Sequence, residues 1–105
     1  MSTASSQTQD QADNTVLDIT HNLNKHRFET EVDGTLAYIS YQIQGERLVY
    51  DHTIVPDAIG GRGIGSALVA HALDYARSEN KKVVPQCPFV ASYIEKHPEY
   101  KDLTK

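Results

Sequence analysis

The sequence predicts an α+β (mixed α/β) domain, in which an antiparallel meander continues through a βαβ unit into a mixed sheet with two main helices. Two observations lead to this class. The first half of the chain holds three strand-like segments joined by short turns, and the second half holds a helix, a short strand and another helix. With 105 residues, the chain has room for one domain at most. We place that domain at residues 16–105.

Residues 1–15, MSTASSQTQDQADNT, are expected to form a disordered tail. The segment consists mainly of Ser, Thr, Gln, Asp and Ala. Such a segment buries too little apolar surface to offset the conformational entropy that it would lose on folding. It contains no hydrophobic run with a basic flank, and therefore lacks the pattern of a secretory signal.

The meander begins with RFETEV at 27–32, where apolar or small side chains alternate with charged ones as in a half-buried strand. Asp33-Gly34 follows, a dipeptide that favours a two-residue hairpin turn. The segment TLAYISYQI then predicts a second strand. Its alternation places four apolar residues on one face, namely Ala37, Ile39, Tyr41 and Ile43.

The third strand is predicted at 47–55, RLVYDHTIV, after a turn at Gly45. It is apolar on parts of both faces, which indicates an interior strand, and Pro56 ends it. Within this strand Asp51 adjoins His52, and simple alternation would point the two side chains to opposite faces of the sheet.

The second half of the chain predicts a right-handed βαβ crossover. SALVAHALDYARSE carries apolar residues at helical spacing and predicts an amphipathic helix of about four turns. The segment KKVVPQC then predicts a short strand, which we expect to lie parallel to the third strand. Pro88 suits the first turn of a second helix, PFVASYIEKH, and Pro98 lies beyond its end.

Composition limits the classes of partner and location. The net charge of −4 argues against a nucleic-acid partner, and no segment is long and apolar enough to enter a membrane. A single cysteine, Cys87, excludes an internal disulfide framework and fits the reducing cytoplasm. The histidines have no partners at metal-ligand spacing, so no metal is expected. A core this small would gain from dimerisation, and we expect a monomer or a weak homodimer.

The segment GGRGIGSALVAHAL, from Gly60 to Leu73, predicts an anion site. It lies at the carboxyl end of a parallel strand, where α/β proteins place ligands, and it opens a helix. A helix start presents unpaired N–H groups with partial positive charge, and glycines allow a phosphate to approach them closely. A tight loop that only serves the fold is the alternative.

Two familiar phosphate motifs fit this loop poorly. A P-loop would need Lys and Ser or Thr after Gly65, but Ser66-Ala67 follows and no lysine is present. A dinucleotide-binding fingerprint would accept Ser66 at its last small position. That fold, however, places its loop after the first strand of a parallel sheet, whereas three antiparallel strands come first here.

The segment TIVPDAIGGRGIGSALVAHAL resembles the cofactor-binding segment of the GNAT acetyltransferases, in which a Gln/Arg-x-x-Gly-x-Gly/Ala loop holds the pyrophosphate of acetyl-CoA. Here Gly60 stands where Gln or Arg is usual, and Arg62 lies two residues later. Whether Arg62 replaces the missing side chain is left open. The cofactor-binding residues implied are Ile54 and Val55 for the pantetheine arm, and Gly60, Gly61, Arg62, Gly63, Ile64, Gly65 and Ser66 for the pyrophosphate.

The downstream segment VVPQCPFVASYIEKHPEY extends this resemblance to the small, single-domain GNAT-like proteins of the YjdJ type. The similarity covers residues 27–100, and CPFVASYIEKHPEY is its most specific part. It implies a minimal GNAT-like fold, acetyl-CoA as the cofactor and acyl transfer to an amine. The helices that cover the acceptor site in larger members have no counterpart between the first strands here.

His52 is the first candidate for the catalytic base. It lies near the carboxyl end of the third strand, and an imidazole with an ordinary pKa near 6.5 accepts a proton near neutrality. The alternative is a half-buried strand histidine bonded to a neighbour. The family resemblance favours the functional interpretation.

Cys87 is the second candidate. Pro88 at the first helical position makes Cys87 the expected N-cap, where the positive helix end favours the thiolate. It ends the strand beside that of His52, so a Cys–His pair is plausible. The alternative is a small buried apolar residue. The resemblance favours function, either as the acid for the departing CoA thiolate or as a nucleophile that carries the acetyl group transiently.

The sequence therefore predicts an acetyl-CoA-dependent N-acetyltransferase. A CoA-binding or protein-interaction module with little or no catalysis is the alternative, because an uncovered acceptor side is compatible with a domain that kept the cofactor and lost the substrate. No sequence feature identifies the acceptor amine. An open site favours a protein or peptide, and the net negative charge suits a cationic amine.

Overall fold

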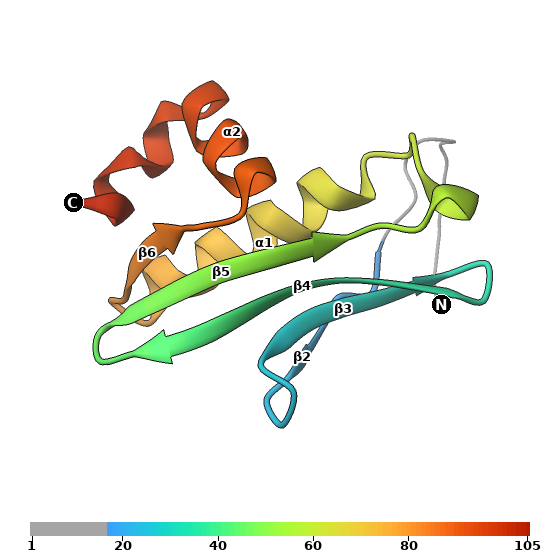
Figure 1. Ribbon diagram of the computed structural model, residues 1–105, viewed down its shortest axis with the longest axis horizontal. Helices are drawn as coiled ribbons and strands as arrows, with labels where there is room; N and C mark the ends of the chain where they lie inside the picture. The colour runs from blue at the N-terminus through green and yellow to red at the C-terminus, as the bar shows by residue number, and fades with distance from the viewer. Residues whose placement is uncertain (1–16) are drawn as a thin grey trace, which may run out of the picture.

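The computed structural model describes residues 17–105, and the tail predicted at residues 1–15 lies outside this range. The described residues form a five-stranded mixed sheet with the order β2-β3-β4-β5-β6 (Figure 1). The strands are β2 (Thr20–Asn22), β3 (Arg27–Val32), β4 (Thr35–Gln44), β5 (Arg47–Ile54) and β6 (Lys82–Pro85). The helices are α1 (Ile64–Ser78) and α2 (Pro88–Lys96), with 3-10 segments η2 (Asp57–Ile59) and η3 (Pro98–Thr104).

The predicted meander is confirmed. β3, β4 and β5 pair antiparallel with their sequence neighbours, and the pair Val32↔Thr35 closes the first hairpin. Both turn residues adopt left-handed backbone conformations, with φ of 51° at Asp33 and 76° at Gly34. This geometry matches the right-handed twist of the flanking strands, which explains why Asp-Gly is favoured there.

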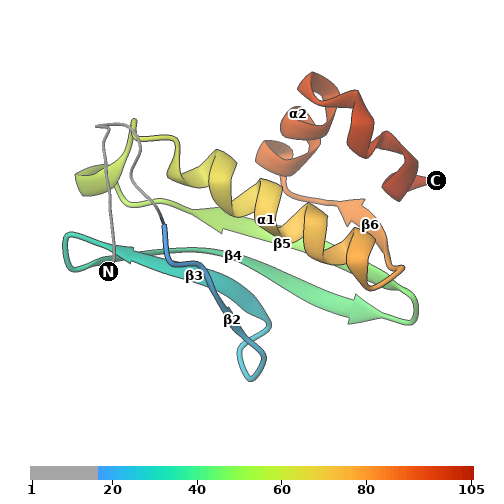
Figure 2. The ribbon, with the colours of Figure 1, turned by 180° about the vertical axis from the view of Figure 1, so that it is seen from behind.

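The predicted βαβ unit is also confirmed. β6 pairs parallel with β5 from Arg47↔Lys82 to Tyr50↔Pro85, and α1 connects them. α1 lies across one face of the sheet, as the two opposite views show (Figures 1 and 2). We call this the helix face. No described helix lies in front of β3, β4 and β5 on the other side, which we call the open face.

The core lies between the helix face and α1. Phe28, Ile39 and Tyr50 are fully buried, and the Tyr50 hydroxyl donates a hydrogen bond of 2.6 Å to the carbonyl of Ala72 in α1. Burial raises the pKa of Tyr50, so this hydroxyl stays a donor at any physiological pH. Ile43, which alternation places on the same face as Ala37, Ile39 and Tyr41, is 54% exposed. Alternation assigns a residue to a face of the sheet, but it does not say whether that part of the face is covered.

Three elements, β2, η2 and η3, have no counterpart among the predictions. β2 is held by His21, whose ring stacks on Phe28 at 4.2 Å between centroids and whose Nε2 lies 2.6 Å from the Tyr41 hydroxyl. η3 is held by Arg77 of α1, which donates to the Asp102 carboxylate at 2.9 Å and to the Glu99 carbonyl at 2.8 Å.

Candidate active site

The glycine loop brings the start of α1 close to the end of β5. Gly61 and Gly63 both adopt left-handed conformations, with φ of 76° and 75°, and Gly63 is the N-cap of α1. A Cβ at either position would meet no atom within 4 Å, so the loop surface is open at these two points. Glycine is therefore required here by backbone conformation rather than by packing.

The start of α1 has the character of an anion site. Its N-cap residue, Gly63, has no side chain that could cap it, and its first turn carries no acidic residue that would neutralise the helix dipole. The first backbone bond into the helix runs from the Ala67 N–H to the Gly63 carbonyl at 3.0 Å. The N–H groups of Ile64, Gly65 and Ser66 consequently have no backbone acceptor among the described residues, and such groups can donate to an anion.

Arg62 contacts the turn between β3 and β4. Its guanidinium forms an ion pair of 2.8 Å with Asp33 in the β3–β4 turn, and both side chains are exposed. Exposed ion pairs are weak, so Arg62 remains able to exchange Asp33 for another anion.

The pairing of β5 with β6 ends before the carboxyl end of β5. β6 stops pairing with β5 at Tyr50↔Pro85, and the Cys87 N–H makes the last bond between them, 2.9 Å to the Tyr50 carbonyl. β5 continues to Ile54 while the chain after Cys87 turns into α2. The edge of β5 on the side of β6 has no strand partner beyond Tyr50 among the described residues. An extended ligand can bond such an edge as an added strand does.

His52 lies on the open face next to a β-bulge. β4 and β5 pair at Tyr41↔Tyr50 and again at Ser40↔His52, so Asp51 is an extra residue in β5. The Asp51 carboxylate accepts hydrogen bonds from Ser40 Oγ at 2.6 Å and from Gln42 Nε2 at 3.0 Å.

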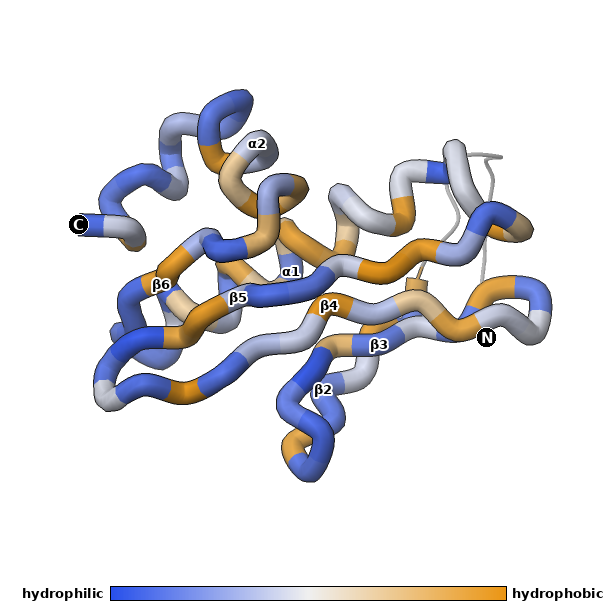
Figure 3. The backbone as a smooth tube through the Cα atoms, in the orientation of Figure 1, coloured by the Kyte–Doolittle hydropathy of each residue, from blue (hydrophilic) through white to orange (hydrophobic). Residues whose placement is uncertain are grey.

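The bulge overturns the expectation that Asp51 and His52 point to opposite faces. Ser40 bonds Asp51 and pairs with His52, so both side chains share the open face. Partial burial opposes ionisation of Asp51, but the hydrogen bonds from Ser40 and Gln42 and the nearby His52 lower the pKa of the carboxyl overall. An exposed imidazole with a fixed carboxylate beside it can serve as a base. Figure 3 shows this hydrophilic stretch of β5 between two hydrophobic ones.

Cys87 lies on the helix-face side, at the N-cap of α2 as predicted. The residue is buried, and its Sγ lies 3.6 Å from Thr53 Oγ1. Burial opposes ionisation of the thiol, but the Thr53 hydroxyl and the N–H groups of Val90 and Phe89 lower its pKa below the ordinary value. No capping hydrogen bond forms, so these N–H groups act as nearby dipoles.

The two catalytic candidates lie on different sides of β5. Thr53, which meets the Cys87 sulfur, pairs with the core residue Ile39, whereas His52 pairs with Ser40 on the open face. Among the described residues, no hydrogen bond joins Cys87 to a histidine. The side-chain partner of the thiol is Thr53. Sequence reasoning missed Ser40, Gln42 and Thr53, because no local pattern marks a residue whose role depends on its cross-strand neighbour.

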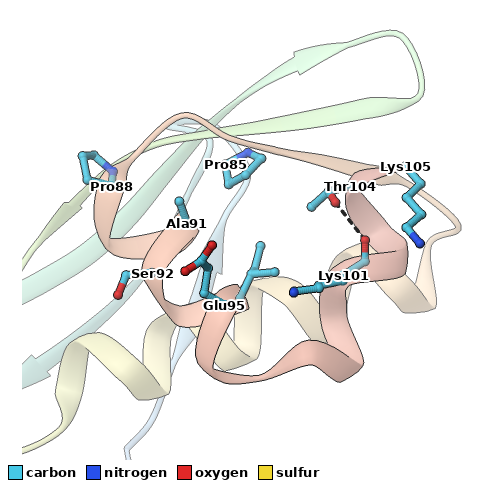
Figure 4. Close-up of a pocket in the computed structure, with 9 residues that line it drawn as sticks. Pro85, Pro88, Ala91, Ser92, Glu95, Lys101, Thr104 and Lys105 are labelled. Carbon is cyan, nitrogen blue, oxygen red and sulfur yellow. Dashed lines mark hydrogen bonds between the residues drawn. The ribbon is translucent and has the colours of Figure 1, made fainter.

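A separate pocket lies between α2 and η3 (Figure 4). Its volume is about 560 Å³, and none of the predicted site residues lines it. The lining residues are Pro85, Pro88, Ala91, Ser92, Ile94, Glu95, Lys101, Thr104 and Lys105. Among residues 17–105, no group of three or more His, Cys, Asp or Glu side chains is placed to hold a metal ion. No helix in the same part of the chain has the length and hydropathy needed to cross a membrane.

The sheet is mixed, the pairing of its two parallel strands ends before the end of β5, and the helix that connects them begins at a glycine loop. Together these features define a GNAT-like α+β protein. The chain belongs to the GCN5-related N-acetyl-transferase family, whose model matches residues 27–103. This confirms the resemblance seen in the sequence.

The chain is similar to vertebrate and bacterial proteins over most of its length. It is 32% identical over 85 residues to Protein NATD1 of Gallus gallus, covering 78% of this chain and 77% of the relative. It is 32% identical over 83 residues to Protein NATD1 of Homo sapiens, covering 76% and 74%. The solution NMR structure of a GCN5-like protein from Staphylococcus aureus superposes with a TM-score of 0.67 at 31% identity, covering 83% of this chain and 86% of that one.

Proposed function

We propose that this protein is an acetyl-CoA-dependent N-acetyltransferase that acts on an amine. The observation that carries the proposal is the start of α1, where the N–H groups of Ile64, Gly65 and Ser66 have no backbone acceptor among the described residues. It lies beside the edge of β5 that has no strand partner beyond Tyr50 among the described residues. Family membership supports the same cofactor class. Residues 16–105 would form the single transferase domain.

The residues present fit acetyl-CoA. The N–H groups from Gly61 to Ser66 would hold the pyrophosphate, because they combine free donors with the positive end of a helix. Arg62 would add a positive charge if it exchanged Asp33 for a phosphate. The backbone of Ile54 and Val55 would bond the amides of the pantetheine arm at the open edge of β5. Bound acetyl-CoA would supply an acetyl thioester for transfer to the amine nitrogen, with release of CoA thiol.

His52 would accept the proton that the amine loses, either directly or through one water molecule. It stands on the open face, the side from which an acceptor can approach, and the Asp51 carboxylate beside it would stabilise the imidazolium. Cys87 would act from the start of α2, beside Thr53 of β5. Its thiol would either donate a proton to the departing sulfur or receive the acetyl group as a thioester before the amine takes it. In both routes the amine gains one acetyl group and loses one proton.

A thiol-release assay with acetyl-CoA and a panel of amines tests the proposal. The panel should contain a lysine peptide, a peptide with a free N-terminus and a polyamine. Turnover of at least one amine, lost in His52→Ala, is the expected result. Calorimetry with acetyl-CoA distinguishes a failure of cofactor binding from a failure of catalysis. Binding without turnover of any amine would leave a CoA-binding module, and the absence of binding would overturn the proposal.

A further inference from the structure

One ion pair joins the glycine loop to the turn between β3 and β4. Arg62 Nη1 donates to Asp33 Oδ2 at 2.8 Å, and the two residues are 29 positions apart in the chain. The loop and the turn lie at the same end of the molecule in both views (Figures 1 and 2). The side chains of Arg62 and Asp33 are 50% and 71% exposed, so the pair can open without disturbing the core.

Arg62 is the one charged residue among residues 60–65. It stands between Gly61 and Gly63, whose left-handed conformations lead the chain into α1. The N–H groups of the candidate anion site follow directly. The guanidinium of Arg62 would add a positive charge to this site, but in the structure that charge is balanced by a carboxylate from another part of the chain.

The hairpin turn keeps the Asp33 carboxylate within reach of Arg62. Asp33 and Gly34 form a two-residue connection with φ of 51° and 76°, and the pair Val32↔Thr35 closes it. A tight turn of this kind leaves little backbone freedom. Asp33 is therefore presented to the glycine loop by a fixed element of the sheet.

We propose that Asp33 competes with the cofactor phosphates for Arg62 and thereby limits the affinity of the glycine loop for acetyl-CoA. This inference rests on the proposed function. A carboxylate and a phosphate bind a guanidinium through the same N–H donors, so one group has to leave before the other can bind. The ion pair is then an autoinhibitory contact, and its loss should strengthen cofactor binding.

Asp33→Asn tests the proposal with little change to the fold. Asn-Gly favours the same two-residue turn as Asp-Gly, so the hairpin should form and only the charge is lost. In calorimetry this variant should bind acetyl-CoA about two- to fivefold more tightly than the wild type, the range expected for the release of one exposed ion pair. The gain should shrink in about 0.5 M salt, which screens exposed charges. Unchanged or weaker binding would overturn the inference.

Two controls distinguish the loss of this ion pair from a general loss of negative charge. Glu31→Gln removes the same charge two residues earlier, in β3, and should leave the affinity within about 1.5-fold. When Arg62 is already replaced by Gln, Asp33→Asn should no longer strengthen binding, because no guanidinium is left to release. A gain of equal size in either control would indicate direct repulsion between Asp33 and the cofactor, and would overturn the inference.

The same titrations separate this inference from the proposed function. A wild-type protein that does not bind acetyl-CoA would overturn the proposed function and this inference with it. A wild-type protein that binds acetyl-CoA with the same affinity as Asp33→Asn would overturn this inference alone.

Discussion

Replacing Gly63 separates the stability of the glycine loop from its capacity to bind an anion. Gly63 has φ of 75° and ψ of 14°, and a Cβ there meets no atom within 4 Å. Asn and Asp fit the space equally, and each should cost about 1 kcal/mol for the left-handed backbone conformation. The Asp carboxylate lies beside the helix start, where a negative charge gains about 0.3–1 kcal/mol. Gly63→Asp should therefore be as stable as Gly63→Asn or slightly more stable.

The affinity for acetyl-CoA should change in the opposite direction. A carboxylate about 5 Å from a phosphate, at an effective dielectric constant of about 40, is repelled by about 1.7 kcal/mol, so Gly63→Asp should bind at least about tenfold more weakly than Gly63→Asn. Urea denaturation measures stability, and calorimetry at two salt concentrations measures affinity. The difference in affinity should shrink as salt increases. Equal affinities in the two variants would show that no phosphate lies at this helix start.

Three further predictions concern other parts of the chain. Thr53→Val should raise the pKa of the Cys87 thiol, because it removes a hydroxyl that favours the thiolate, and alkylation against pH should report the shift. Burial, followed by the charges of His71 and His26, lowers the pKa of His21 from 6.5. Below about pH 6.5 the unfolded chain then binds more protons than the folded chain. The free energy of unfolding should therefore be greatest above about pH 6.5 and should fall as the pH decreases through the lowered pKa. Urea titrations of His21→Gln should not show this loss. Deletion of residues 1–13 should change neither the melting temperature nor the affinity for acetyl-CoA. A loss of more than about 1 kcal/mol in the free energy of unfolding would refute the prediction that these residues do not pack on the domain.

The parts of the fold that the sequence predicted are those with local signals. Asp33-Gly34 marks a hairpin turn, Pro56 follows a strand, Pro88 begins a helix, and the apolar spacing of α1 is helical. β2 and η3 depend on contacts far apart in the chain. β2 is three residues long and is held by the contact of His21 with Tyr41, 20 residues away. No pattern within the sequence of β2 predicts this contact.

The residues of the candidate site also divide into those with a local sequence signal and those that depend on contacts between strands. The glycine loop and the N-cap position of Cys87 were predictable, because both follow from residue types next to a helix start. The face of Asp51 was not, because a β-bulge is a property of the pairing between β4 and β5 and not of either strand alone. The separation of His52 from Cys87 likewise depends on register, which the sequence of one strand does not contain.

Titration of the protein with acetyl-CoA, followed by NMR at each backbone amide, tests the central claim most directly. The account predicts saturable shifts at Gly63, Ile64, Gly65 and Ser66 and at Ile54 and Val55, with small shifts in β2 and η3. The pocket between α2 and η3 provides the internal control. Shifts confined to Ala91, Ser92 and Lys101 in that pocket, or no saturable shift in the glycine loop, would contradict an acetyl-CoA site at the start of α1.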